Sequence, residues 1–406
     1  MKFIHFADAH LDSPFRGLSF LPSTVFDQIY RASDESLKRI VDLALKEQVD
    51  LVLIAGDTFD SDHPSPRSQL FFSQQIKRLT DQEIQVVMIF GNHDHMAASN
   101  LLVAPNKYFK LLGDGQKIEQ ITFTTRNNFN YDVVGFSYLN NHIVDDLVKD
   151  FPKKGPNYTF GLMHAQEKES RTEKNVYAPY KLDEIIDLNY DYFALGHIHA
   201  RRVLSQKPWI VYSGNIQGRH INELGVKGCY LGTIDESTKE TKLQFYQTGP
   251  IVWKQVVLPL TKAINKSELR EQVLQALAQV KETTYFSLKL TGAQFLTDEE
   301  IELVEDNTFW QSISQALPYM SQLVDVRLET EDLINLNQAS QQYFDQAEAE
   351  IFASDQLAKI IKDWSHKAPI TENLAQNPQF LDEVMALTKV KLANKLKGIE
   401  DETEKN

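Results

Sequence analysis

The chain has 406 residues, more than one domain core usually holds, so its length indicates two or three domains. Hydrophobic residues make up 42% and charged residues 24%, as in ordinary globular proteins, and no apolar run reaches the roughly 18 residues of a membrane span. The net charge of −14 argues against a chain that binds nucleic acid through overall positive charge. The single cysteine, Cys229, excludes an internal disulfide. Because the first residues become polar too soon for a signal peptide, we expect a cytoplasmic protein without a membrane segment.

The negative charge is unevenly distributed along the chain. Residues 1–250 contain 27 Lys and Arg against 31 Asp and Glu, a net charge of −4. Residues 251–406 contain 15 against 25, a net charge of −10. The negative charge is therefore weaker evidence against nucleic-acid binding by residues 1–250 than by residues 251–406.

Strand-like and helix-like segments alternate at the start of the chain. Short apolar runs at 2–7, 50–55 and 85–90 predict buried strands. Apolar periodicity predicts helices over 33–45 and 66–82, the first opening at Ser33-Asp34-Glu35. This alternation predicts an α/β layer fold with parallel strands.

Further strands and a change of pattern follow. Strand candidates lie at 131–136, 158–163, 192–195, 209–212, 229–234 and 242–246. Near Thr248-Gly249-Pro250 the pattern changes, and we place a domain boundary there, so that 1–250 forms the first domain. Residues 251–330 predict a small α+β domain with a helix over 267–282 and strands at 285–290 and 323–328. Residues 331–406 predict a helical segment with an apolar face.

Five short polar motifs follow the strand-like runs. They are Asp8-x-His10, Gly56-Asp57-x-x-Asp60, Gly91-Asn92-His93-Asp94, the lone His164 and Gly196-His197-x-His199. Ligands of open parallel sheets bind beyond the carboxyl ends of the strands, so loops far apart in sequence can converge there. In Asp8-x-His10 and His197-x-His199 we expect a locally extended backbone, which points the side chains of residues i and i+2 in the same direction. We also expect the three glycines to let the chain turn sharply after each strand.

The residue types in these motifs are those of a metal site. Two carboxylates, one amide oxygen and several imidazoles form a mixed oxygen and nitrogen set, which suits Mn²⁺, Fe²⁺ or Zn²⁺. Seven ligands exceed what one such ion usually takes, so we expect two ions. Asp57 is the natural bridge, because a carboxylate has two oxygens to divide.

The five motifs in this order resemble the signature of the calcineurin-like metallophosphoesterases. The stretches FADAHLDSPFRGL and YSGNIQGRHINELGVKG are similar to bacterial DNA repair exonucleases of the SbcD and YhaO type. The motif resemblance covers roughly residues 1–235. It implies a metallophosphoesterase β-sandwich flanked by helices as the catalytic domain. It further implies a small α+β capping domain and a helical C-terminal segment that holds a partner.

The resemblance also implies roles for individual residues. One metal ion would bind Asp8, His10, Asp57 and His199, and the other would bind Asp57, Asn92, His164 and His197. His93 would be the catalytic histidine near the scissile phosphate. Asp60 and Asp94 would orient ligands or His93 through hydrogen bonds.

The function implied is a Mn²⁺-dependent nuclease in DNA repair. Its partners would be DNA and an SMC-like coiled-coil ATPase, with two copies of each chain in the complex. A second hypothesis keeps the chemistry but gives it small nucleotides or phosphoproteins as substrates. A third hypothesis is a catalytically silent scaffold, against which the intact ligand positions argue.

Several other residues allow two interpretations. Surface salt bridges or contacts with substrate phosphates would each explain Arg16, Arg219 and His220. Core packing or stacking on unpaired bases would each explain Phe15, Phe59 and Tyr138. His5, inside the first predicted strand, is expected to be packed.

Overall fold

The computed structural model describes most of the chain up to Leu328. The described residues are 1–13, 23–168, 176–280, 282–296, 298–328, Gln346 and Glu350. They belong to two compact units, Met1–Trp253 and a second unit that begins at Lys254. The described residues do not include Phe15 or Arg16. Of the predicted helical segment 331–406, they include only Gln346 and Glu350. No helix in the described part is both long and apolar enough to cross a membrane.

The first unit contains two six-stranded sheets. The first sheet has the order β12-β11-β1-β2-β3-β4. Its strands are β1 (Lys2–Phe6), β2 (Leu51–Ala55), β3 (Gln85–Ile89), β4 (Phe109–Leu111), β11 (Gly228–Ile234) and β12 (Thr241–Gln247). Strands β1 to β4 run parallel, whereas β11 pairs antiparallel with both β1 and β12.

The second sheet has the order β5-β6-β7-β8-β10-β9. Its strands are β5 (Glu119–Thr124), β6 (Asn130–Gly135), β7 (Tyr158–His164), β8 (Tyr192–Gly196), β9 (Arg202–Gln206) and β10 (Trp209–Tyr212). The four central strands are parallel, and the two edge strands are antiparallel to their neighbours. The two sheets are therefore mixed rather than purely parallel.

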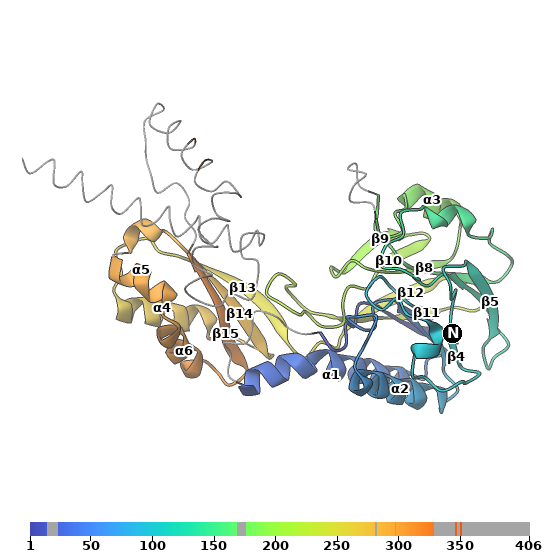
Figure 1. The fold of residues 1–406 in the computed structure, drawn as a ribbon, viewed down its shortest axis with the longest axis horizontal. Coiled ribbons are helices and arrows are strands. Elements are labelled where there is room, and N and C mark those ends of the chain that lie inside the picture. Colours follow the sequence, from blue (N-terminus) through green and yellow to red (C-terminus); the bar gives the residue numbers. More distant parts are fainter. Residues whose placement is uncertain are drawn as a thin grey trace, which may run out of the picture. The chain divides into compact units, whose positions relative to one another are not determined.

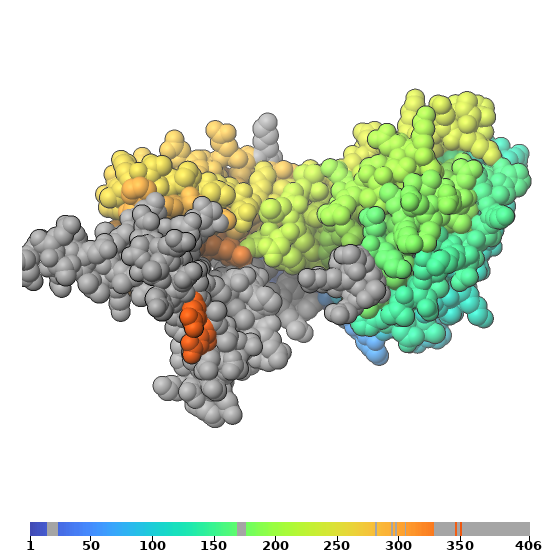
Figure 2. Space-filling model, turned by 90° about the horizontal axis from the view of Figure 1, so that it is seen from above, coloured from blue at the N-terminus to red at the C-terminus, as the bar shows by residue number. Residues whose placement is uncertain are grey.

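Helices cover the outer faces of these two sheets (Figure 1). Helices α1 (Ser23–Glu47) and α2 (Pro66–Thr80) lie on the first sheet, and α3 (Leu182–Asp187) lies on the second. Short 3₁₀ turns, η1 (Ala98–Asn100) and η2 (Leu147–Asp150), lie in the loops. Figure 2 shows this unit from above, where the green residues around α3 and the second sheet form much of the near face.

Aromatic and aliphatic side chains fill the space between the sheets. Phe3 lies edge-on to Phe160, with ring centroids 5.0 Å apart, and to Tyr192, with ring centroids 4.8 Å apart. Strands β2 and β3 are buried at every position, which explains their continuous apolar sequence. The predicted β-sandwich flanked by helices is confirmed.

Several element boundaries differ from the prediction. Helix α1 begins at Ser23 rather than Ser33, because Val25 and Ile29 extend its buried face. Asp34, interpreted as part of a helix start, instead forms an ion pair with Arg67 of α2. The short strands β4, β5 and β9 were not predicted, and their exposed or half-buried residues give little apolar signal.

The second unit is a small α+β fold, as predicted. Its sheet has the order β13-β14-β15. The elements are β13 (Val252–Pro259), α4 (Lys266–Leu277), β14 (Thr284–Thr291), η4 (Ala293–Phe295), α5 (Asp298–Glu305), α6 (Asn307–Ala316) and β15 (Ser321–Leu328). Helix α4 starts in a capping box between Asn265 and Glu268 and ends at Leu277, earlier than predicted.

Candidate metal centre

The five sequence motifs meet at one edge of the sandwich. Asp8, Asp57 and Asn92 follow the parallel strands β1, β2 and β3 of the first sheet. His164 ends β7, and the His197-x-His199 motif follows β8, the neighbouring strand of the second sheet. Carboxyl ends of strands from both sheets therefore supply the polar groups, as the strand-end argument predicted.

The backbone at these positions is turned, not extended as predicted. Positive φ angles occur at Asp8 (52°), His10 (43°), Asp57 (50°) and His197 (97°), in a region that residues other than glycine rarely adopt. The backbone N–H of His197 donates to Oδ1 of Asp8 at 3.0 Å, which ties the first motif to the last. Such strained conformations cluster at functional sites, where surrounding contacts hold them.

The three motif glycines serve different purposes. Gly56 has a φ of 86° and provides the predicted turn. Gly91 and Gly196 do not have positive φ, and the expectation of a sharp glycine turn is wrong for them. A Cβ at Gly91 would overlap Oδ1 of Asp57, and one at Gly196 would overlap the Ala55 carbonyl oxygen. Both glycines are needed for close approach.

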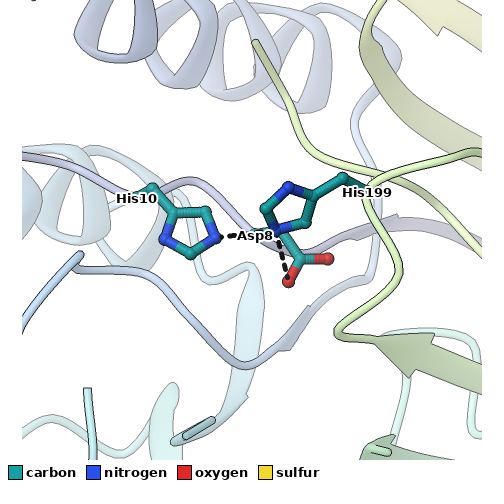
Figure 3. A group of neighbouring side chains, drawn as sticks. All are labelled: Asp8, His10 and His199. Atoms are coloured by element: carbon teal, nitrogen blue, oxygen red, sulfur yellow. Dashed lines mark hydrogen bonds and ion pairs between the residues drawn. The ribbon is translucent and has the colours of Figure 1, made fainter. Parts of the chain in front are cut away.

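The first group of ligand-like side chains is Asp8, His10 and His199 (Figure 3). The imidazoles of His10 and His199 face one another, with their Nε2 atoms 3.0 Å apart. Nε2 of His199 lies 4.0 Å from Oδ1 of Asp8. Asp8 and His10 are almost fully buried.

Carboxylates beside the Nδ1 atoms of both imidazoles determine whether their Nε2 atoms carry lone pairs. Nδ1 of His10 lies 2.9 Å from Oδ1 of Asp60, and Nδ1 of His199 donates to Oε1 of Glu223 at 2.6 Å. The hydrogen bond to Glu223 requires a proton on Nδ1 of His199, and the charge of Asp60 favours the same tautomer of His10, so each neutral imidazole presents a lone pair at Nε2. Two facing lone pairs repel unless a proton or a metal cation lies between them. Nitrogens bound at about 2.1 Å to one ion, at a right angle, lie about 3 Å apart, so the pair fits a shared metal ion.

The second group consists of Asp57, Asn92, His164 and His197, which follow or end β2, β3, β7 and β8. Nε2 of His164 lies 3.0 Å from Oδ1 of Asn92 and 3.3 Å from Oδ2 of Asp57. Nδ1 of His197 lies 3.2 Å from the same Asn92 oxygen. Nδ1 of His164 is 3.0 Å from the Ala55 carbonyl oxygen and donates its proton there, so release of the second ring proton leaves Nε2 facing these oxygens with a lone pair. Converging acceptors again fit a cation.

The pKa values follow the same pattern. Burial would lower the pKa of His164, but the facing Asp57 carboxylate raises it to about 9. Burial would raise the pKa of Asp57, but His164 and His10 hold it well below its usual range. Burial lowers the pKa of His197 to about 3, so that imidazole is neutral. The potential between Asp57 and His164 thus favours a positive charge.

Asp57 lies between the two groups. Its Oδ1 accepts the backbone N–H of His93 at 2.9 Å. Its Oδ2 lies 3.3 Å from Nε2 of His164 and 3.8 Å from Nε2 of His10. Oδ2 therefore faces both groups, and Oδ1 binds the backbone of His93. This differs from the expectation that each group would receive one of the two carboxylate oxygens.

His93 is the exposed histidine of the site. Its side chain is 43% exposed, and its ring lies edge-on to His10 with centroids 5.0 Å apart. Nδ1 lies 3.3 Å from the carbonyl oxygen of Asp60. Asp94 accepts the backbone N–H groups of Gly91 and Thr58, both at 2.7 Å, and so joins the loops that carry Asn92 and Asp57.

The structure also locates the residues that had two interpretations. Nη1 of Arg219 donates to Oδ1 of Asp60 at 2.6 Å, and the exposed His220 lies 3.6 Å from Glu223. Phe59 and Tyr138 are 0% and 1% exposed, as core packing requires.

Glu223 and Tyr177 are site residues that the sequence argument missed. Glu223 lies in the YSGNIQGRHINELGVKG stretch, but nothing in that stretch pairs it with His199 across the fold. The Tyr177 ring lies 4.6 Å from the His197 ring, between centroids. No sequence signal distinguishes Tyr177 from other tyrosines of the chain.

Two cavities open beside the centre. One, of about 330 Å³, is lined by Asp60, Ser61, Asp62, Asn92, His93, His95, Asn141 and Tyr177. The other, of about 310 Å³, borders His197 and is lined partly by Lys168 and Arg202. A larger cavity, of about 580 Å³, includes Asp50 and Gln85 at the opposite ends of β2 and β3, and none of the ligand-like residues. The two smaller cavities are therefore the ones that border the candidate ligands.

Comparison with known proteins agrees with this geometry. Residues 1–201 match the family described as calcineurin-like phosphoesterase. The metallophosphoesterase YhaO of Bacillus subtilis is 32% identical over 295 residues, which cover 72% of this chain and 69% of YhaO. The chain belongs to the calcineurin-like metallophosphoesterase family. Members of this family are metal-dependent phosphoesterases, and the clusters Asp8–His10–His199 and Asp8–Asp57–His164 are candidate divalent-metal sites of this metallophosphoesterase.

More distant relatives carry more specific names. The SbcD component of the nuclease SbcCD from Staphylococcus epidermidis is 24% identical, with 75% of this chain and 82% of that protein covered. The DNA double-strand break repair protein Mre11 of Sulfolobus acidocaldarius is 27% identical, with 50% of each chain covered. This metallophosphoesterase thus spans about half the length of that Mre11 protein.

Proposed function

We propose that this metallophosphoesterase is a two-metal nuclease that hydrolyses phosphodiester bonds in DNA. The observation that carries the proposal is the pair of donor groups on either side of Asp57 Oδ2. One ion would be held by Asp8, His10, Asp57 and His199, and the other by Asp57, Asn92, His164 and His197. The mixed oxygen and nitrogen donors suit Mn²⁺.

The chain's own residues would complete the chemistry. When bound, two divalent ions lower the pKa of water and neutralise charge on phosphoryl oxygens. His93, on the exposed rim, would donate a proton to the leaving sugar oxygen, a contribution of about 10²–10⁴-fold. The Asp57 contact to the His93 backbone would hold this histidine beside the phosphate.

DNA as substrate, and a role in repair, are supported by the names of the distant relatives. The relative from Staphylococcus epidermidis is named as one part of a larger nuclease, which supports a second component. We propose that this component is an SMC-like coiled-coil ATPase, in a cytoplasmic complex with two copies of each chain. Residues 251–406 have a net charge of −10, which suits docking to a protein better than contact with DNA.

A nuclease assay with metal titration tests this proposal. Metal-free protein is incubated with end-labelled linear DNA and increasing Mn²⁺, with and without an SMC-like ATPase, and with bis(p-nitrophenyl) phosphate in parallel. We expect DNA cleavage that rises with Mn²⁺ and is absent from the Asp57→Ala variant. The exposed Asp81→Asn variant, away from the cavities beside the centre, serves as a matched carboxylate control.

Two outcomes would overturn the proposal. Hydrolysis of the small ester without DNA cleavage, even with the ATPase present, would indicate a phosphodiesterase for small substrates. A wild-type protein that takes up no divalent ion would indicate a scaffold.

A further inference from the structure

We infer that Glu223 and Arg219 are positioning residues that hold His10 and His199 ready for one metal ion, and that only this one of the two ion positions depends on them. The inference rests on the metal-dependent function proposed above. It assigns roles to two residues outside the seven candidate ligands.

Glu223 has every carboxylate oxygen engaged. Its side chain is 8% exposed. Oε1 accepts Nδ1–H of His199 at 2.6 Å, while Oε2 accepts Nδ2–H of Asn215 at 2.8 Å and the backbone N–H of Arg219 at 2.7 Å. These hydrogen bonds fix where the carboxylate lies, and the carboxylate in turn fixes the His199 ring.

Arg219 links this carboxylate to the one behind the second histidine. Its Nη1 donates to Oδ1 of Asp60 at 2.6 Å, and its Nη2 lies 3.6 Å from Oε1 of Glu223. The same Asp60 oxygen lies 2.9 Å from Nδ1 of His10. The contacts form a closed ring, from Glu223 through His199, His10, Asp60 and Arg219 back to Glu223.

The ring explains how two buried carboxylates can orient two adjacent imidazoles. Glu223 keeps His199 protonated at Nδ1, the charge of Asp60 favours the same tautomer of His10, and both carboxylates increase the basicity of Nε2. Two carboxylates so close together would repel each other, and the single guanidinium between Asp60 and Glu223 offsets that repulsion. Arg219 therefore acts on both histidines without touching either ligand nitrogen.

The second ion position lacks such a ring. Nδ1 of His164 donates to the neutral carbonyl oxygen of Ala55 at 3.0 Å, and the Asp8 carboxylate lies farther away, at 3.9 Å. Among the described residues, no carboxylate forms an ion pair with Nε2 of His197. Changes at Glu223 or Arg219 should thus weaken the ion held by His10 and His199 and leave the other ion in place.

Binding of Mn²⁺ to metal-free protein tests this directly. Wild type, Glu223→Gln, Glu223→Ala and Arg219→Met are titrated by calorimetry, and bound Mn²⁺ is counted by electron paramagnetic resonance. We expect two ions in wild type and an affinity about 10–100-fold lower for one ion in the variants. Glu223→Gln keeps an acceptor for His199 and should lose less than Glu223→Ala.

The control is Asp81→Asn, which breaks an exposed ion pair of 2.6 Å with Lys77 and should bind both ions normally. Thermal unfolding of the metal-free variants checks that they fold. Wild-type affinities for both ions in every variant would overturn the inference, and so would equal weakening of both ions. A wild type that binds no ion would instead overturn the proposed function.

Discussion

Oδ2 of Asp57 lies 3.3 Å from Nε2 of His164, although the two residues belong to the ends of strands in different sheets, one just after β2 and the other at the end of β7. Asp57 follows β2 in the first sheet and His164 ends β7 in the second. The contact therefore joins the two halves of the sandwich at the candidate centre. Because the same oxygen also faces His10, one carboxylate serves both groups of donors.

Replacing Asp57 should abolish hydrolysis. Asp57→Ala removes the oxygen shared by the two groups, so we expect both ions to be lost and activity to fall below about 1% of wild type. Metal content by elemental analysis, together with turnover of DNA, checks this expectation. The size-preserving Asp57→Asn variant should behave alike, since it also loses the charge. Either variant retaining more than a few per cent of activity would exclude the bridging role.

His93→Ala should separate metal binding from turnover. His93 is exposed and contacts the centre through its backbone N–H, which alanine retains. We expect normal metal content and a turnover reduced by about 10²-fold or more, because a proton donor is lost. His63→Ala, at an exposed histidine away from the candidate ligands, is the matched control and should stay at wild-type level. Loss of metal from His93→Ala would contradict the assignment.

Gly196→Ala should damage the centre through sterics alone. The added Cβ would overlap the Ala55 carbonyl oxygen and approach Nδ1 of His164. We expect a loss of about 1–3 kcal/mol of unfolding free energy and weaker metal binding. Gly155→Ala, where the new Cβ meets only Asp132 Oδ2 at 3.9 Å, should change neither quantity. Denaturant unfolding and metal titration of the two variants provide the comparison.

His5 should make the metal-free protein sensitive to mild acid. It is fully buried beside Tyr192, and burial lowers its pKa from 6.5 to about 3. Between these values the unfolded chain binds a proton that the folded chain does not, so stability is full above pH 6.5 and falls as the pH drops. From pH 7 to pH 5 this residue should cost wild type about 2 kcal/mol of unfolding free energy.

The His5→Gln variant isolates this effect, because glutamine stays neutral at every pH. Urea unfolding of both chelator-treated proteins at pH 7 and pH 5 should show the smaller pH dependence in the variant. Equal pH dependence in the two proteins would mean that His5 is not the group that titrates.

Much of the fold and of the candidate centre was predictable because it depends on local signals. The buried strands β1, β2 and β3 are mainly apolar, and each is followed by a polar motif. The edge strands β4, β5 and β9 were not predictable, since half-exposed strands lack that pattern. The start of α1 was misplaced, because Asp34 resembles a helix cap when its partner Arg67 is unknown.

By itself the sequence determined which strands are buried and which polar residues follow them, since apolar runs and turn residues act over a few neighbouring positions. It did not determine that Asp8, His10 and Asp57 adopt left-handed backbone, or that Gly91 and Gly196 are needed for close approach. Only the tertiary structure decided that Glu223 orients His199 and that Arg219 joins Glu223 to Asp60. These contacts are made across the packed sandwich, where distance in space is independent of distance along the chain.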